Sequence, residues 1–169
     1  MGRSLDDIVA GLETFSPAKG RMETSLLSDG IVLIEDTYNA NPLSVKAALI
    51  ALDEMGGSGE RIVVLGDMLE LGESSAALHR EVGEFAAVHC DRLFLLGPES
   101  REIAAGARSA GMAATRVTSC ASHSEATQAL IHSVRPGARI LIKGSRGMKM
   151  EKIAAELRSK LGLTPTKGR

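Results

Sequence analysis

The sequence has very few aromatic residues and no long apolar run. Phe, Trp and Tyr make up 2% of its 169 residues, and Trp is absent. Proteins that stack single-stranded bases need aromatic side chains, so that class is excluded. No apolar run approaches the roughly 20 residues of a membrane-spanning helix, and the first residues lack the apolar core of a secretion signal. These absences predict a cytoplasmic protein with no membrane span.

Cysteine is scarce, and neither sign of charge dominates. Cys90 and Cys120 lie far apart and form no CxxC pair, which argues against a disulfide framework or a thiolate metal site. Lys and Arg (20) nearly balance Asp and Glu (21), so no basic field is available to bind nucleic acid. With 44% hydrophobic and 24% charged residues, the composition is typical of a folded globular domain with an aliphatic core.

Two nucleotide-binding motifs are also missing from these residues. There is no GxxxxGK[ST] segment, so no P-loop is present, and no GxGxxG follows a predicted strand. The glycine-rich run at 56–61 precedes a strand, which is the wrong context for a phosphate cradle. A domain of this kind is expected to supply only part of an active site.

Strand and helix patterns alternate from residue 22 onward, and their apolar runs are typical of strands buried on both faces. The turn Ser28-Asp29-Gly30 predicts that the first two strands pair antiparallel. The pattern therefore predicts an α/β fold with a doubly wound, mostly parallel sheet of about six strands and one antiparallel edge strand. Strands are expected at 22–27, 31–35, 61–65, 92–96, 115–118 and 139–142, and helices at 41–55, from 74 or 75, and at 99–110, 122–134 and 149–161.

The two ends are interpreted as separate from this domain. Residues 1–20 resemble the tail of a preceding domain, with a short helix at 4–12, followed by a linker; the domain itself is expected at 21–161. Residues 162–169 are expected to fray. The amphipathic start suggests a piece of a longer protein.

Polar residues follow three of the parallel strands, whose carboxyl ends meet at one edge of the sheet. After the first come Asp36, Tyr38, Asn39 and Asn41. Asp36 could accept a ribose hydroxyl, and the Asn amides can donate and accept hydrogen bonds. The alternative is structural, with Asn41 as a helix cap and Asp36 as an ordinary loop acid.

The other two loops carry opposite charges. Lys143 and Arg146 surround small residues ahead of a helix, which favours a carboxylate or phosphate site; the alternative is a basic turn in solvent. Asp67 and Glu70 could line a cleft or bind a cation through water, or belong to a solvated acidic loop. His79, in the next helix, could orient either carboxylate or be structural.

No metal site is predicted in these residues. His89, His123 and His132 have no metal-ligand spacing, and neither cysteine is expected to be a nucleophile.

Three segments, in this order, resemble the C-terminal domain of the Mur ligases. They are IEDTYNANPLSVKAAL at 34–49, VVLGDMLELGE at 63–73 and KGSRGMKME at 143–151. The resemblance covers residues 4–160, and KGRME at 19–23 resembles the junction with the central domain.

This resemblance implies a Rossmann-like domain that closes over ATP and magnesium held by a central domain in cis. The motif forms are most similar to those of family members that join D-alanyl-D-alanine to UDP-N-acetylmuramoyl-tripeptide in peptidoglycan precursor synthesis. The carboxylate is activated as an acyl phosphate, which the amine then attacks. Because the P-loop is missing, the chain alone is expected to be inactive and to bind no cofactor tightly.

The resemblance also implies roles for single residues. Arg21 is expected to be catalytic, at the γ-phosphate of ATP. Other expected contacts are Asp36 with the ribose, Tyr38 and Asn39 with the nucleotide, Asn39, Asn41, Lys143, Ser145 and Arg146 with the dipeptide, and Asp67 and Glu70 as cleft lining.

Two alternatives to this reading stay open. One is a sibling Mur or folyl-polyglutamate-type ligase domain, although the last loop argues against it. The other is a non-catalytic Rossmann-like binding module.

Overall fold

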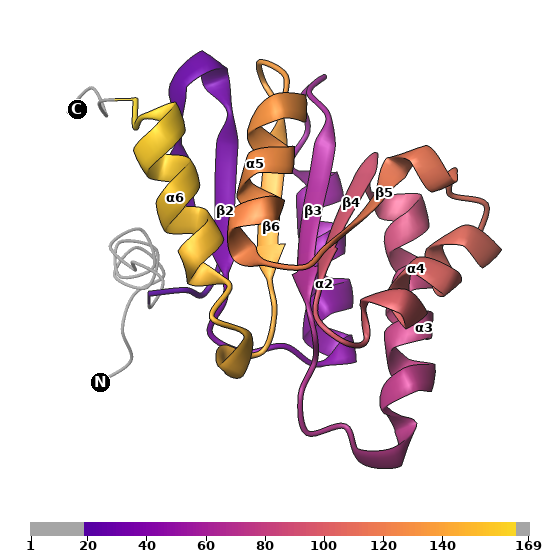
Figure 1. The fold of residues 1–169 in the computed structure, drawn as a ribbon. Coiled ribbons are helices and arrows are strands. Elements are labelled where there is room, and N and C mark those ends of the chain that lie inside the picture. The colour runs from indigo at the N-terminus through magenta and orange to yellow at the C-terminus, as the bar shows by residue number, and fades with distance from the viewer. Residues whose placement is uncertain (1–18, 165–169) are drawn as a thin grey trace, which may run out of the picture.

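The computed structural model describes residues 19–164, which form one mixed sheet between two layers of helices (Figure 1). The strand order is β1-β2-β6-β3-β4-β5. β1 pairs antiparallel with β2, and the other neighbouring pairs are parallel. The predicted helix at 4–12 and the residues after 164 lie outside the described residues. The strands are β1 (Glu23–Leu26), β2 (Val32–Asp36), β3 (Arg61–Gly66), β4 (Arg92–Leu96), β5 (Val117–Cys120) and β6 (Arg139–Lys143).

Helices cover both faces of the sheet, so the predicted doubly wound α/β fold is confirmed. One core cluster joins one face to the first three helices, and a second joins the other face to the last two. Between residues 19 and 164, no helix is both long and apolar enough to cross a bilayer. The helices are α2 (Pro42–Glu54), α3 (Ser75–His89) and α4 (Ser100–Ser109) on one side, and α5 (His123–Ser133) and α6 (Glu151–Leu161) on the other.

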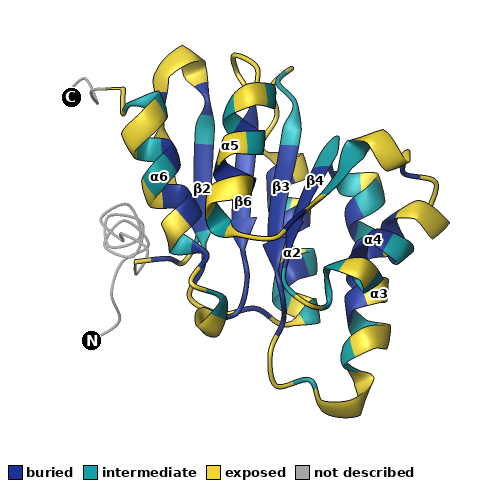
Figure 2. Ribbon diagram, viewed as in Figure 1, coloured by how far each residue is buried: buried dark blue, intermediate teal, exposed yellow. Residues whose placement is uncertain are grey.

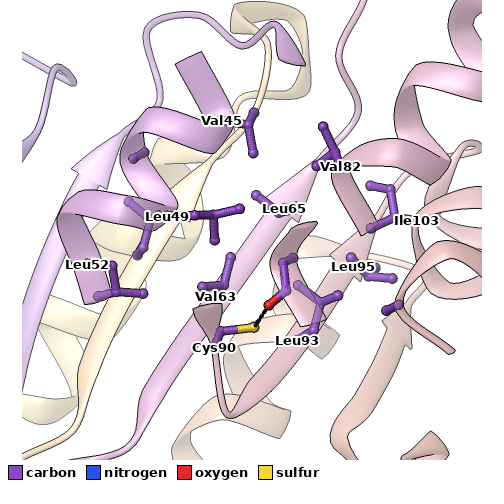
Figure 3. Packing of buried hydrophobic residues seen from close by; sticks show 14 of the residues in the cluster. Val45, Leu49, Leu52, Val63, Leu65, Val82, Cys90, Leu93, Leu95 and Ile103 are labelled. Carbon is purple, nitrogen blue, oxygen red and sulfur yellow. Dashed lines mark hydrogen bonds between the residues drawn. The ribbon is translucent and has the colours of Figure 1, made fainter. Parts of the chain in front are cut away.

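Alternation along the central strands separates the two cores. In β3, Val63 and Leu65 pack towards α2 and α3, whereas Ile62 and Val64 pack towards α5 and α6. Figure 3 shows the first cluster, and Figure 2 shows that the sheet is the most deeply buried layer. Since burying one such aliphatic side chain contributes about 1.5–3 kcal/mol, a core of Leu, Ile, Val and Ala suffices without Trp.

The predicted strand and helix bounds agree with the structure to within one residue, except in β5 and at the start of α6, which is Glu151 instead of residue 149. β5 begins at Val117 instead of residue 115, because residues 114–116 form a 3₁₀ turn closed by a hydrogen bond from Arg116 N to Ala113 O. Of the tail predicted at 162–169, the first three residues are described. Leu163 bridges to Leu27, and Thr164 N donates to Leu26 O, which ties them to the end of β1.

The chain order places a switch point at the carboxyl end of β6. β6 is inserted between β2 and β3, and α6 packs on the opposite face from α2 and α3. The loops that leave β2 and β3 therefore diverge from the loop that leaves β6. Ligands of open α/β sheets bind in the crevice that such divergence creates.

Glycines allow α3 and α4 to pack closely. A Cβ added at Gly83 would overlap the carbonyl oxygen of Ile103, and one at Gly106 would overlap that of Arg80. The contact is therefore backbone against backbone, and a side chain of any size at either position must push the helices apart.

We expect Gly83→Ala to destabilise the chain by about 1–3 kcal/mol, because overpacking of the helix contact outweighs the better helix propensity of Ala, about 1 kcal/mol. Urea unfolding followed by circular dichroism measures this. Ala105→Gly in α4 is the matched control for helix propensity and should cost about 1 kcal/mol. A Gly83→Ala variant more stable than the parent would contradict the close approach.

Candidate functional site

The centre of the site is an ion pair between the ends of two neighbouring strands. Asp36 ends β2 and Lys143 ends β6, and the two are register partners. Lys143 is 1% exposed; its Nζ donates to Asp36 Oδ2 and, at 2.9 Å, to the backbone oxygen of Asn39. Because a buried ammonium needs a counter-ion, the pair fixes the Asp36 carboxylate at the rim of the crevice.

This pair opens into a cavity of about 240 Å³. The cavity brings together residues from the predicted junction, from the loop after β2 and from β6. Most of the side chains that the sequence predicted for nucleotide or dipeptide binding gather here. The lining residues are Arg21, Asp36, Tyr38, Asn39, Asn41, Ser44 and Lys143.

Two guanidinium groups lie near the ring of Tyr38. The Cζ atoms of Arg21 and Arg146 are 4.2 Å and 5.8 Å from the centroid of its ring. Gly20 brings Arg21 to this position: its φ is +71°, and its carbonyl accepts a hydrogen bond from Tyr38 N at 2.9 Å. Each cation–π contact contributes about 0.5–1 kcal/mol at an exposed ring, so the ring orients both cations while leaving them open to an anion.

The two asparagines use their carbonyl oxygens locally. Asn39 Oδ1 accepts from Ala40 N, and Asn41 Oδ1 accepts from Ser44 N at 2.8 Å to close a capping box on α2. The structural alternative for Asn41, a helix cap, is therefore confirmed. No hydrogen bond from either NH₂ group is recorded within residues 19–164, and both groups remain as donors.

Ser145 joins all three loops. Its Oγ accepts from Leu69 N at 2.8 Å and donates to Ala40 O at 3.3 Å, and its backbone N donates to Asp67 O. Ser145 is only 4% exposed, so its contacts hold the three loops in position around the crevice.

The loop after β3 lies beside the crevice, and its two acidic side chains have different surroundings. Asp67 is buried and accepts two long hydrogen bonds from Glu99 N, at 3.2 and 3.4 Å. Burial raises the pKa of the Asp67 carboxyl, an effect that the Glu99 amide partly offsets. Glu70 is exposed, at a positive φ of 65°.

His79 holds the backbone of this loop, and no contact with either acidic side chain is recorded. It is fully buried; its Nε2 accepts from Met68 N at 2.9 Å, and its Nδ1 donates to Ser75 O at 2.8 Å. The structural interpretation of this histidine is the one that the contacts support. Within residues 19–164, no group of three or more His, Cys, Asp or Glu side chains could hold a metal ion.

Two acidic residues near the site were not predicted from the sequence. Glu35 is buried at the end of β2; Arg158 Nη2 donates to its Oε2 at 2.7 Å, and the Thr37 hydroxyl to its Oε1 at 3.1 Å. Glu151 begins α6 beside Arg146. A charged residue in an otherwise apolar strand was the available signal for Glu35. Glu151 gave none.

The two thiols are held away from reaction. Burial raises the pKa of Cys90 to about 12, and its Sγ donates to Ala86 O. Burial also raises the pKa of Cys120. Both thiols therefore stay protonated near neutral pH, and neither cysteine is placed as a nucleophile of the site.

We expect both thiols to resist Ellman's reagent in the folded chain at pH 8 and to react within minutes in urea. Absorbance of the released thiol measures this. Raising the pH to 9 increases the small thiolate population about tenfold, but burial should still keep the native reaction far slower than the reaction in urea. Rapid titration of a thiol without denaturant would contradict the buried placement.

Residues 20–146 match the family model described as the Mur ligase, glutamate ligase domain. The chain belongs to the Mur ligase family. The matched range contains the whole crevice described above, and the expected resemblance is confirmed.

The relatives within the Mur ligases that are about one-third identical in sequence to this chain carry one enzyme name. The chain is 35% identical over 157 residues to the UDP-N-acetylmuramoyl-tripeptide–D-alanyl-D-alanine ligase of Bacillus subtilis, covering 92% of the chain and 34% of that protein. A crystal structure of MurF from Acinetobacter baumannii matches with a TM-score of 0.79 and 34% identity, covering 94% of this chain and 34% of that one. The chain thus spans about a third of the length of these Mur ligases.

A third match supports the fold alone. The MurF ligase of Thermotoga maritima, solved in complex with ADP, matches with a TM-score of 0.76 at 24% identity, covering 90% of this chain and 34% of that one.

Proposed function

We propose that this Mur ligase domain is the part of an ATP-dependent ligase that closes over ATP and holds D-alanyl-D-alanine for addition to UDP-N-acetylmuramoyl-tripeptide. The observation that carries the proposal is the gathering of Arg21, Asp36, Tyr38 and Lys143 from separate segments around one crevice. The names of the one-third identical relatives support it and make a sibling specificity the weaker alternative.

At the nucleotide, the proposed roles follow from charge. The Asp36 carboxylate keeps lone pairs beyond the one that Lys143 uses, and these suit a ribose hydroxyl. Arg21 carries a permanent charge at an exposed position and suits the γ-phosphate, where phosphoryl transfer depends on positioning and neutralisation. Tyr38 and Asn39 line the same cavity as Asp36 and Arg21.

At the amine substrate, the proposed roles belong to the last loop and the α2 cap. Arg146 is exposed and can bind a carboxylate with two parallel hydrogen bonds. The NH₂ groups of Asn39 and Asn41 can donate to a peptide carbonyl. Lys143 and Ser145 contribute by holding Asp36 and the neighbouring loops.

The reaction in this proposal joins two substrates in two steps. The tripeptide carboxylate takes the γ-phosphoryl group of ATP to form an acyl phosphate and ADP. The dipeptide amine then attacks the acyl carbon, and phosphate leaves. Magnesium is assigned to the central domain, as the resemblance to the Mur ligases implies.

The domain limits belong to the same proposal. Residues 1–20 are assigned to the tail of the central domain and its linker, 21–161 to this domain, and 162–169 to a terminal tail. We place the protein in the cytoplasm, where ATP and a reducing environment suit two free thiols.

The test is a ligation assay with the full-length protein. Purified enzyme, ATP and UDP-N-acetylmuramoyl-tripeptide are incubated with D-alanyl-D-alanine, or with single amino acids that sibling ligases add. The proposal expects ADP and the pentapeptide product with the dipeptide only. Product with a single amino acid would support a sibling ligase, and no product with any amine would support a non-catalytic module.

The 169-residue chain alone should form no product in the same assay, because it has no P-loop. Ligation by this chain alone would contradict the division of labour between the domains.

A further inference from the structure

A second cavity, of about 320 Å³, is also lined by Tyr38. It is bounded by the chain before β1, the end of β2, the 3₁₀ turn Arg146–Met148 and the start of α6. Its volume is at the lower end of the range for small-molecule sites. The charged and polar side chains that line it are Lys19, Glu35, Thr37, Tyr38, Arg146 and Glu151.

One carboxylate in this cavity lacks a partner. Glu151 Oε2 is shielded from solvent and accepts no hydrogen bond, and no ion pair to Glu151 is found among residues 19–164. Its position in the first turn of α6 favours a negative charge, but supplies no donor to this oxygen. A shielded carboxylate oxygen without a donor is unfavourable, so a ligand that brings an N–H group to this oxygen would be favoured.

The neighbouring acid behaves in the opposite way. Both carboxylate oxygens of Glu35 have donors, from Arg158 and Thr37. The charge of Glu35 is therefore balanced inside the domain, whereas that of Glu151 is not. Within residues 19–164, the uncompensated negative charge at this cavity is therefore that of Glu151.

A cation with no recorded ion pair lines the same cavity. Arg146 is exposed, and its recorded side-chain contact is with the face of Tyr38 at 5.8 Å. No ion pair joins it to Glu151 or to any other residue in the 19–164 range. Among residues 19–164, the cavity thus presents a negative group, Glu151, and two positive groups, Arg146 and Lys19, with no ion pair between them.

We propose that this cavity binds a small zwitterion, whose ammonium donates to Glu151 and whose carboxylate is bound by Arg146. The proposal rests on the function proposed above, in which the amine substrate is D-alanyl-D-alanine, a molecule with both charges. It adds Glu151 as the residue that recognises the ammonium end. Lys19, at the same cavity, favours the carboxylate end as well.

The test measures recognition of the ammonium separately from the reaction. Full-length enzyme is assayed for the KM of D-alanyl-D-alanine and for inhibition by N-propionyl-D-alanine, which has the same shape without the ammonium. In the parent enzyme the dipeptide should bind at least tenfold more tightly than this analogue. Glu151→Gln should raise the KM of the dipeptide at least tenfold, remove the preference, and leave the KM of ATP unchanged.

Two variants separate binding from folding. Glu156→Gln makes the same change one turn further along α6, where the carboxylate pairs with Lys160, and should alter neither constant. Glu151→Asp keeps the charge and should retain part of the preference, even if Glu151→Gln lowers the melting temperature. Arg146→Gln should instead remove the preference for the dipeptide over its C-terminal amide.

The outcomes distinguish the two proposals. If the parent enzyme ligates the dipeptide and Glu151→Gln and Glu151→Asp both keep the tenfold ammonium preference, the zwitterion site is wrong while the function stands. If the parent enzyme does not ligate the dipeptide, the function and the site both fail.

Discussion

Replacing Arg21 with Ala should lower the kcat of the full-length ligase by about 100- to 1,000-fold. Removing a single preorganised donor to a developing negative charge has an effect of this order. The side chain is exposed and contacts the face of Tyr38, so the fold should survive the change. Steady-state ADP release, with the melting temperature as a check on folding, measures the effect.

The controls for this variant separate charge from geometry. Arg21→Lys keeps the charge but loses the planar, forked donor, and should recover only part of the rate. Arg101→Ala removes an arginine that is 83% exposed at its side chain on α4 and should leave kcat unchanged. An Arg21→Ala enzyme within about threefold of the parent would remove Arg21 from the catalytic machinery.

Replacing Lys143 with Met should destabilise the 169-residue chain by about 3–5 kcal/mol. Met has a similar length but leaves Asp36 as an uncompensated charge at the end of β2, and breaking a buried pair on one side has a cost of this size. For a domain of this length the melting temperature should fall by roughly 6–20 °C. Calorimetry measures the loss, and ATP affinity in the full-length enzyme should fall with it.

The same pair offers an internal control. In the double variant Lys143→Met/Asp36→Leu no charge is left unpaired, so part of the lost stability should return. Lys160→Met, which breaks an exposed pair with Glu156, should cost at most about 1 kcal/mol. A loss below about 1 kcal/mol for Lys143→Met would contradict the buried pair.

Most of the fold could be predicted from local sequence. Short apolar runs such as RIVVL and RILI favour strands that are buried on both faces of a sheet. Each is followed by an amphipathic helix. The antiparallel first pair followed from a three-residue turn and is confirmed. The start of β5 was wrong by two residues, because the 3₁₀ turn at 114–116 has no sequence signal of its own.

The place of the candidate site could be predicted, but the division of roles within it could not. Polar residues after β2, β3 and β6 had to converge once the strands were parallel. That Lys143 pairs with Asp36, and that Ser145 joins three loops, depends on contacts between residues about 75 to 107 positions apart. Within residues 19–164, the pairing of Glu35 with Arg158 and the unpartnered Oε2 of Glu151 both depend on the packing of α6 against β2.

Hydrogen–deuterium exchange of the full-length enzyme, with and without ADP and D-alanyl-D-alanine, tests whether the crevice beside β2 and β6 is the ligand site. We expect ligands to slow exchange in the loops at 36–44 and 143–151 and to leave the opposite edge of the sheet, at 56–60 and 135–138, unchanged. Protection confined to that opposite edge, with none at 36–44 or 143–151, would contradict the assignment of the crevice as the site.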